Sequence, residues 1–150
     1  MVDLVTPSHV ADYLLAESRD RGEVLTNLKL QKLLYYAQAW HLALYKKPLF
    51  DEDFQAWVHG PVLPSQYRRF SRNEWRPITE QVDRPHFDDA DIEKFLNEVI
   101  DVFGTETAVS LELMTHRERP WLEARGGIPM DESSQARIDK AVMREYYGSL

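Results

Sequence analysis

Arginine and aromatic side chains alternate in one short stretch of the sequence, and these residue types are suited to recognition. Tyr67, Arg68, Arg72, Trp75 and Arg76 lie close together in a chain whose formal charge is −7. Guanidinium groups bind carboxylates and phosphates through paired hydrogen bonds, and aromatic rings bury a large area with few rotatable bonds. The stretch therefore predicts a contact surface for a protein or for single-stranded nucleic acid. The alternative is a solvated basic turn that balances nearby acidic residues.

Histidines and carboxylates form the second set with chemical potential. The five histidines have neither HxxxH nor HExxH spacing, so the sequence predicts no metal site. An acid–base enzyme would need clustered groups with perturbed pKa values, and His59, His116 and an acid from 51–53 are the best candidates for such a cluster. Hydrolase, kinase and phosphate-loop motifs are absent from the sequence. We therefore expect a protein without catalytic residues and without a cofactor.

Composition limits the class of protein further. The 150 residues are 43% hydrophobic and 29% charged, which predicts one globular domain covering 1–150. The chain has no cysteine, which excludes disulfides, thiolate metal sites and cysteine nucleophiles. Its negative charge opposes generic binding to nucleic acid or to anionic membranes. The N-terminus lacks the pattern of a signal peptide and no apolar run is long enough to span a bilayer, so we expect a cytoplasmic protein without membrane contact.

The elements that must position these residues are mostly helices. From about 26 to 45 the chain is apolar nearly all round, which is typical of a central helix buried on every side. Around it the pattern predicts a short strand or hairpin near 54–58 and a long loop at about 71–87. The predicted fold class is thus mainly α, a compact helical domain around a central apolar helix. Further helices are expected from a Ser8 cap to Arg21, from Ser65 to Phe70, after Asp88 or Asp89, from Thr105 or Thr107 to before Pro120, and from Asp131 or Ser133 to Tyr147.

Several motifs, in a fixed order, carry a resemblance to a known family. They are the run from Leu25 to Trp40 with the pattern LxKLLYYAQAW, then Pro48-Leu49-Phe50, AWVHGPV at 56–62, Pro64-Ser65-Gln66-Tyr67, Thr115-His116 and Pro120-Trp121. The chain is similar over nearly its whole length to the Panacea domain of SocA-like antitoxins, a family that includes phage-associated GepA-like proteins. His59 departs from the family pattern, in which an aromatic residue is common before Gly-Pro.

The resemblance implies an antitoxin of a bacterial or prophage toxin–antitoxin system, which neutralises a cognate toxin encoded nearby by direct protein contact. In some members of the family the antitoxin delivers the toxin to a cellular protease, so a proteolytic adaptor is an alternative. A nucleic-acid-binding regulator that uses the arginines at 68–76 and a hydrolase that uses histidine and carboxylate are two others. The resemblance does not distinguish a monomer from a homodimer.

Within this family reading, the motif residues are expected to serve the scaffold and the Arg/Trp stretch is expected to serve the partner. We predict core and turn positions for Lys32, Tyr36, Trp40, Trp57, Gly60, Pro61, His116 and Trp121. We predict toxin contacts for Tyr67, Arg68, Arg72, Trp75 and Arg76, because the pattern of core packing does not account for them.

Overall fold

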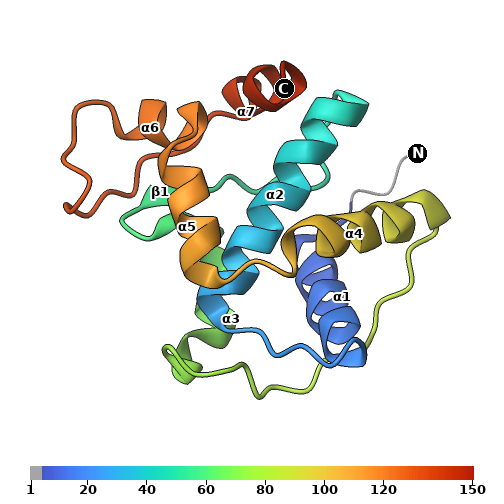
Figure 1. Ribbon diagram of the computed structural model, residues 1–150. Coiled ribbons are helices and arrows are strands. Elements are labelled where there is room, and N and C mark those ends of the chain that lie inside the picture. Colours follow the sequence, from blue (N-terminus) through green and yellow to red (C-terminus); the bar gives the residue numbers. More distant parts are fainter. Residues whose placement is uncertain (1–4) are drawn as a thin grey trace.

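Seven α-helices, one 3-10 turn and one antiparallel two-stranded sheet form residues 5–150, the part of the chain that the computed structural model describes (Figure 1). This mainly helical architecture confirms the predicted fold class. The elements in chain order are α1 (Pro7–Asp20), α2 (Asn27–Tyr45), β1 (Gln55–Trp57), β2 (Gly60–Val62), α3 (Pro64–Phe70), the 3-10 turn η1 (Ser71–Asn73), α4 (Ala90–Phe103), α5 (Ala108–His116), α6 (Arg119–Arg125) and α7 (Lys140–Gly148).

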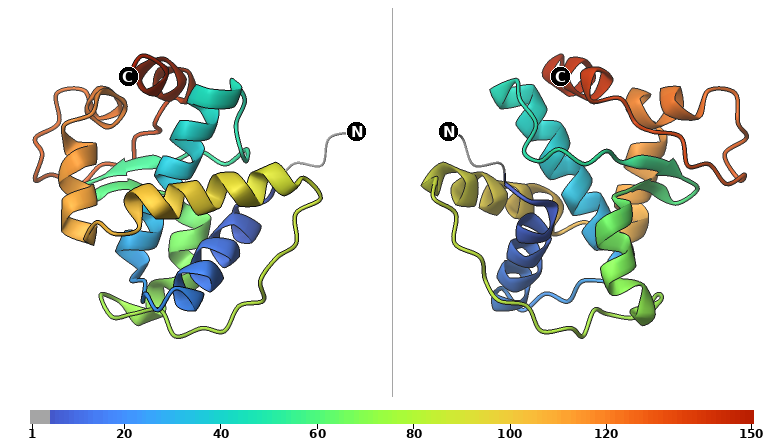
Figure 2. Two further views of the ribbon diagram at one scale, coloured as in Figure 1. Left: turned by 45° about the vertical axis from the view of Figure 1, so that its right-hand side comes forward. Right: turned by 180° about the vertical axis from the view of Figure 1, so that it is seen from behind.

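Helix α2 crosses the middle of the molecule, and the other helices lie on either side of it. Thr26 caps its N-terminus by accepting a hydrogen bond from Lys29 N at 3.2 Å. All residues from 30 to 39 are buried, and the helix ends at Lys46 in a left-handed conformation with φ of 61°. The predicted central helix at 26–45 is confirmed. In the two views of Figure 2, α1 and α4 lie on one side of α2 while α5 and α6 lie on the other.

The strand predicted near 54–58 is confirmed, and it forms a hairpin in which Ala56 pairs with Pro61. The C-terminal segment also lies against this hairpin, because Ala56 N donates to Ala136 O at 2.8 Å and Ile138 N donates to Phe54 O at 2.8 Å. The prediction of a last helix that starts at Asp131 or Ser133 is therefore wrong. Residues 131–139 are not helical, and α7 begins only at Lys140, after Asp139 has capped it.

One other predicted helix boundary is wrong, and one helix was not predicted. Helix α1 is capped by Thr6, whose side chain accepts a hydrogen bond from His9 N at 3.1 Å, and not by Ser8. The helix predicted from Thr105 or Thr107 to before Pro120 is confirmed as α5, which Thr107 caps, but Pro120 itself lies in the first turn of the additional helix α6. Proline is tolerated there since the first N–H groups of a helix have no partner within it. None of the helices in residues 5–150 is both long and apolar enough to cross a bilayer.

The loop predicted at about 71–87 contains η1 and then runs without helix to Asp89. It is fixed to the helices at several points. Ile78 N donates to Leu25 O at 2.8 Å, and the Phe87 ring packs edge-on against Tyr13 with 5.7 Å between centroids. These contacts hold the far part of the loop against α1 and the start of α2.

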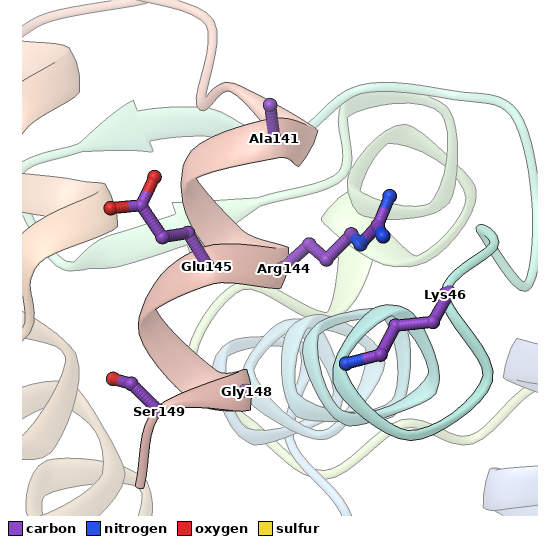
Figure 3. Close-up of a pocket in the computed structure, with 6 residues that line it drawn as sticks. All are labelled: Lys46, Ala141, Arg144, Glu145, Gly148 and Ser149. Carbon is purple, nitrogen blue, oxygen red and sulfur yellow. The ribbon is translucent and has the colours of Figure 1, made fainter.

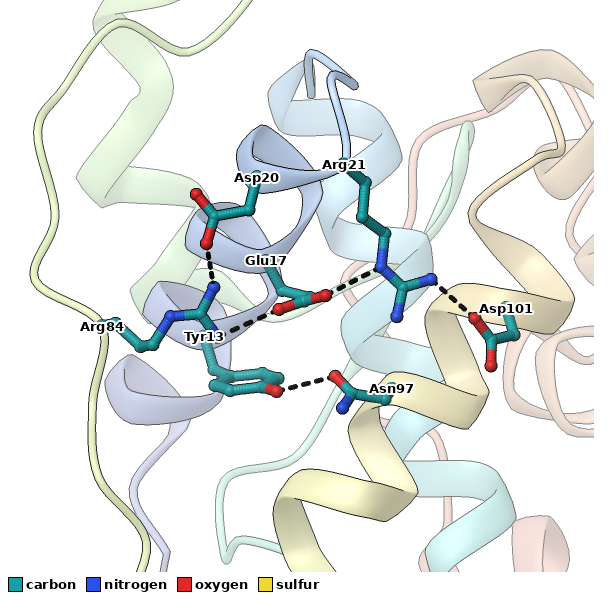
Figure 4. A network of polar contacts seen from close by, with 7 residues as sticks. All are labelled: Tyr13, Glu17, Asp20, Arg21, Arg84, Asn97 and Asp101. Carbon is teal, nitrogen blue, oxygen red and sulfur yellow. Dashed lines mark hydrogen bonds and ion pairs between the residues drawn. The ribbon is translucent and has the colours of Figure 1, made fainter.

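An ion-pair network joins this loop to α1 and α4 (Figure 4). Arg84 of the loop pairs with Glu17 at 3.0 Å and with Asp20, both on α1. Glu17 also pairs with Arg21 at 2.9 Å, and Arg21 reaches Asp101 of α4 at 2.6 Å. The hydrogen bond from Arg21 is the main reason that the pKa of Glu17 is lowered. These partly exposed ion pairs therefore hold the loop against α1, and through Arg21 they join α1 to α4.

Candidate functional site

The five residues predicted to contact a partner lie on one continuous tip made by the end of α3, by η1 and by the turn that follows. We call residues 67–76 the Trp75 tip. Trp75 is 81% exposed, and Arg68, Arg72 and Arg76 are exposed as well. Tyr67 is half-buried, since its ring packs edge-on against Trp57 at 5.0 Å. The tip therefore presents one large apolar side chain among cationic groups.

The backbone of the Trp75 tip is held from inside by Asn73, a residue that was not predicted from the sequence. The buried Asn73 Nδ2 donates to Phe70 O at 3.1 Å and to Glu80 Oε1 at 2.7 Å. The next residue, Glu74, has φ of 55° and ψ of −122°, a conformation that non-glycine residues seldom adopt. The turn at Glu74 is followed directly by Trp75, whose side chain is exposed.

The arginines of the tip differ in how firmly they are held. Arg72 lies 3.3 Å from Glu80, and Arg76 lies 3.3 Å from Glu74, with both guanidinium groups largely exposed. Arg68 forms no ion pair with any residue among 5–150. Exposed ion pairs contribute only about 0–1 kcal/mol. A partner with carboxylates could therefore exchange these pairs at small cost.

Buried polar contacts explain why Lys32, Gly60 and Pro61 occur together. The Lys32 side chain is fully buried, and its Nζ donates to Pro61 O at 3.2 Å. Gly60 has φ of 102°, and a Cβ there would lie 2.6 Å from Lys32 Cε and 2.9 Å from Thr115 Oγ1. Glycine is thus required both for the backbone conformation and for the space that Lys32 fills. Burial lowers the pKa of Lys32 to about 7.

His116 and Trp121 stack on each other beneath the hairpin, with 4.2 Å between ring centroids and 22° between planes. Trp121 is buried, and its Nε1 donates to Trp57 O at 2.9 Å. Arg125 lies over the same indole at 4.7 Å and donates to Ala56 O at 2.9 Å. Burial lowers the pKa of His116. These residues join α5 and α6 to the hairpin, so the structure places them in the scaffold.

A half-buried carboxylate, Glu118, ties α7 to α2. Tyr36 and Tyr147 each have a hydroxyl within hydrogen-bond distance of Glu118 Oε1, at 2.7 and 2.8 Å. Tyr147 OH also lies 3.0 Å from Tyr35 OH. Burial is the main reason that the pKa of Glu118 is raised. Trp40 packs against Tyr147 at 5.6 Å but remains half-buried, as Trp57 does, so these two belong to the edge of the core.

The histidines and acids considered for catalysis have separate neighbours. His59 is exposed at the hairpin turn, and its Nδ1 lies 3.2 Å from Glu112 Oε1, not near an acid from 51–53. Asp53 pairs instead with Lys140, and His116 stacks on Trp121. Within residues 5–150, no group of three or more histidine or carboxylate side chains is arranged to hold a metal ion. The proposed cluster of His59, His116 and an acid from 51–53 is therefore not assembled.

A shallow hollow of about 440 Å³ lies between the C-terminal ends of α2 and α7. Figure 3 shows that Lys46 and Arg144 point to the same side of α7, whereas Glu145 points to the other. Lys46 Nζ donates to Ala43 O at 2.8 Å. Cations are favoured beside the carbonyl groups that end a helix. The position of the Lys46 ammonium in this hollow is therefore explained by stabilisation of the C-terminal end of α2.

Comparison with known proteins assigns the class. The sequence model of the antitoxin SocA-like Panacea domain matches residues 30–122, more than half of the chain. Antitoxin SocA of Caulobacter vibrioides (strain NA1000 / CB15N) is 32% identical over 75% of this chain and 66% of its own length. No solved structure matches. The chain therefore belongs to the SocA-like antitoxin family and contains its Panacea domain. The aligned part spans slightly under two thirds of that relative.

Proposed function

We propose that this protein is an antitoxin that neutralises a toxin by binding it directly through the Trp75 tip. Membership of the SocA-like family supports the antitoxin role. The observation that supports the choice of surface is Trp75, which is 81% exposed although its backbone is held in a fixed turn. Tryptophan and arginine are the residue types that most often dominate binding energy at protein interfaces.

An interface of standard size centred on the tip would cover a limited part of the surface. A standard interface buries about 800 Å² on each partner. That is about a tenth of the 8049 Å² surface of this chain. A matching toxin would have an apolar pocket that receives the Trp75 side chain. Carboxylates around that pocket would lie near Arg68, Arg72 and Arg76, so that the two surfaces agree in shape and charge. The antitoxin would then act by covering the toxin, without turnover of a substrate.

Co-expression with the neighbouring open reading frame tests this proposal. The neighbour is expected to be toxic alone, to be harmless when this protein is present, and to co-purify with it. Trp75→Ala combined with Arg76→Ala is expected to weaken the complex and to leave the melting temperature nearly unchanged. A neighbour that is harmless alone would contradict the antitoxin role. A large fall in melting temperature would show that the tip supports the fold.

Substituting His59 and His116 together by alanine separates this proposal from an enzymatic one. Protection against the toxin should persist in a variant that folds, since His59 pairs with Glu112, His116 stacks on Trp121, and neither belongs to the Trp75 tip. Loss of protection in a variant that folds normally would favour catalysis. Retention of the protein on nucleic acid in low salt, dependent on Arg68 and Arg72, would instead favour a nucleic-acid-binding regulator.

A further inference from the structure

A groove of about 700 Å³ lies at the C-terminal end of α2, a volume typical of ligand sites. The Trp75 tip lies at the other end of this helix, where Asn27 Nδ2 donates to Tyr67 O at 3.0 Å. The groove is walled by the last turn of α2, the start of α1, the segment 47–49 and residues 86–95. Its apolar lining includes Tyr45, Leu49 and Phe95. It is therefore distinct from the surface proposed above.

His41 gives this groove a specific polar group. The residue is only 6% exposed, yet it lines the groove. Its Nδ1 lies 2.8 Å from Lys47 O, and because a carbonyl oxygen only accepts, Nδ1 must carry the proton. Nε2 is then an acceptor, and the Nδ1 contact is the single hydrogen bond that this ring makes with residues 5–150. Burial lowers the pKa of His41, which favours this neutral ring.

The charges around the groove favour a cation. Asp88, Asp89 and Asp91 line it, against the one permanently charged cation of Lys47; the other basic side chains of the lining are the histidines His9, His41 and His86. Asp89 is partly occupied as the cap of α4, since its Oδ1 accepts from Asp91 N at 2.9 Å. Asp88 and Asp91 are exposed and form no ion pair within the described part of the chain. An N–H donor with positive charge would satisfy both the carboxylates and the free imidazole nitrogen.

We propose that this groove binds a lysine or arginine side chain of a partner polypeptide. The apolar stem of that side chain would lie along Tyr45 and Phe95, whose rings are edge-on to each other at 5.8 Å, and its N–H groups would reach His41 Nε2 and the aspartates. A polypeptide fits better than a free amine because Val5, Leu49 and Ile92 extend the apolar lining beyond the reach of one basic group. This inference does not depend on the Trp75 tip or on the identity of the partner as a toxin.

Titration of the isotope-labelled protein with blocked tripeptides, followed by NMR, tests the inference. The probes are Leu-Lys-Leu, the same peptide with norleucine in place of lysine, and 1,5-diaminopentane as a free amine. Leu-Lys-Leu is expected to shift the amides of Lys47, Asp91 and Phe95. It is also expected to bind about fivefold more tightly than either other probe, since one exposed charge contact contributes up to about 1 kcal/mol.

Two variants and one control locate the effect. Asp88→Asn combined with Asp91→Asn should lower the affinity for the lysine peptide by about fivefold and leave the affinity for the norleucine peptide unchanged. Asp83→Asn with Asp131→Asn, which also removes two exposed carboxylates but lies outside the groove, should change neither. Equal binding of the lysine and norleucine peptides, no shifts at all, or equal loss in the control would overturn the proposal. Binding of the diamine as tight as that of the peptide would overturn the assignment to a polypeptide.

Discussion

Replacing the buried Lys32 by methionine should remove a large pH dependence of the stability of this protein. Lys32 is fully buried, with one hydrogen bond, to Pro61 O at 3.2 Å. Burial lowers its pKa from 10.5 to about 7. The folded state therefore holds fewer protons than the unfolded state between these two values. Under that condition the free energy of unfolding rises with pH.

The magnitude follows from proton linkage. Each proton that only the unfolded state binds contributes about 1.4 kcal/mol per pH unit. Near pH 7 the folded Lys32 is half protonated, and by about pH 9 it is nearly neutral while the unfolded lysine stays charged. The free energy of unfolding of the wild type should therefore rise by roughly 2 kcal/mol over this range because of Lys32 alone. Methionine has a similar length and no charge, so the variant lacks this rise.

Urea unfolding at a series of pH values from about 6 to about 9 measures the effect, and the difference between variant and wild type isolates Lys32 from other titrating groups. We expect the advantage of Lys32→Met over the wild type to shrink by roughly 2 kcal/mol between about pH 7 and about pH 9. Lys94→Met, at an exposed position of α4, is the matched control and should run parallel to the wild type. Parallel curves for Lys32→Met would refute the reasoning.

Three further substitutions, one of them with a matched control, test the scaffold around the motif residues. Gly60→Ala should lower the free energy of unfolding by roughly 2–5 kcal/mol, because it adds backbone strain and a Cβ 2.6 Å from Lys32 Cε. The control Gly22→Ala, with open space around it, should lower it by about 1–2 kcal/mol. Similar losses for the two variants in urea unfolding would contradict this. Trp121→Ala should cost roughly 3–5 kcal/mol in the same assay, and a loss below about 1 kcal/mol would place the indole outside the core. Since the pKa of Glu118 is raised, its favourable contribution is complete below its ordinary value of 4.5 and is lost as pH rises through the folded pKa. Glu118→Gln should flatten this fall in stability, and an unchanged pH profile would contradict it.

Local patterns were sufficient to predict the elements that depend on local chemistry. The apolar run of α2 and the spaced apolar residues of α4 identify both helices, and Asp89 caps α4 as expected. The prediction of a helix from Asp131 or Ser133 failed because Ala136 and Ile138 form backbone hydrogen bonds with the hairpin. Local sequence patterns do not report such a non-local contact. Helix α6 was missed because Pro120 was interpreted as a terminator.

The proposed binding surface could be predicted only in part, for a similar reason. The sequence pointed to the arginines and aromatics, and the structure shows that Trp75 lies on an exposed, fixed turn. It could not identify Asn73 or the strained Glu74, since their roles depend on contacts with Phe70 and Glu80. Likewise, the contact between Lys32 of α2 and Gly60 of the hairpin could not be predicted from the sequence, because only the fold brings these two residues together.

The affinity of the Trp75→Ala variant for the toxin, measured by calorimetry, tests the central claim most directly. Leu44→Ala is the control, because Leu44 is 59% exposed at the opposite end of α2. We predict that Trp75→Ala weakens binding by about tenfold or more with an unchanged melting temperature, and that Leu44→Ala binds as the wild type does. Wild-type affinity in a folded Trp75→Ala variant would contradict the assignment of this tip as the toxin-binding surface.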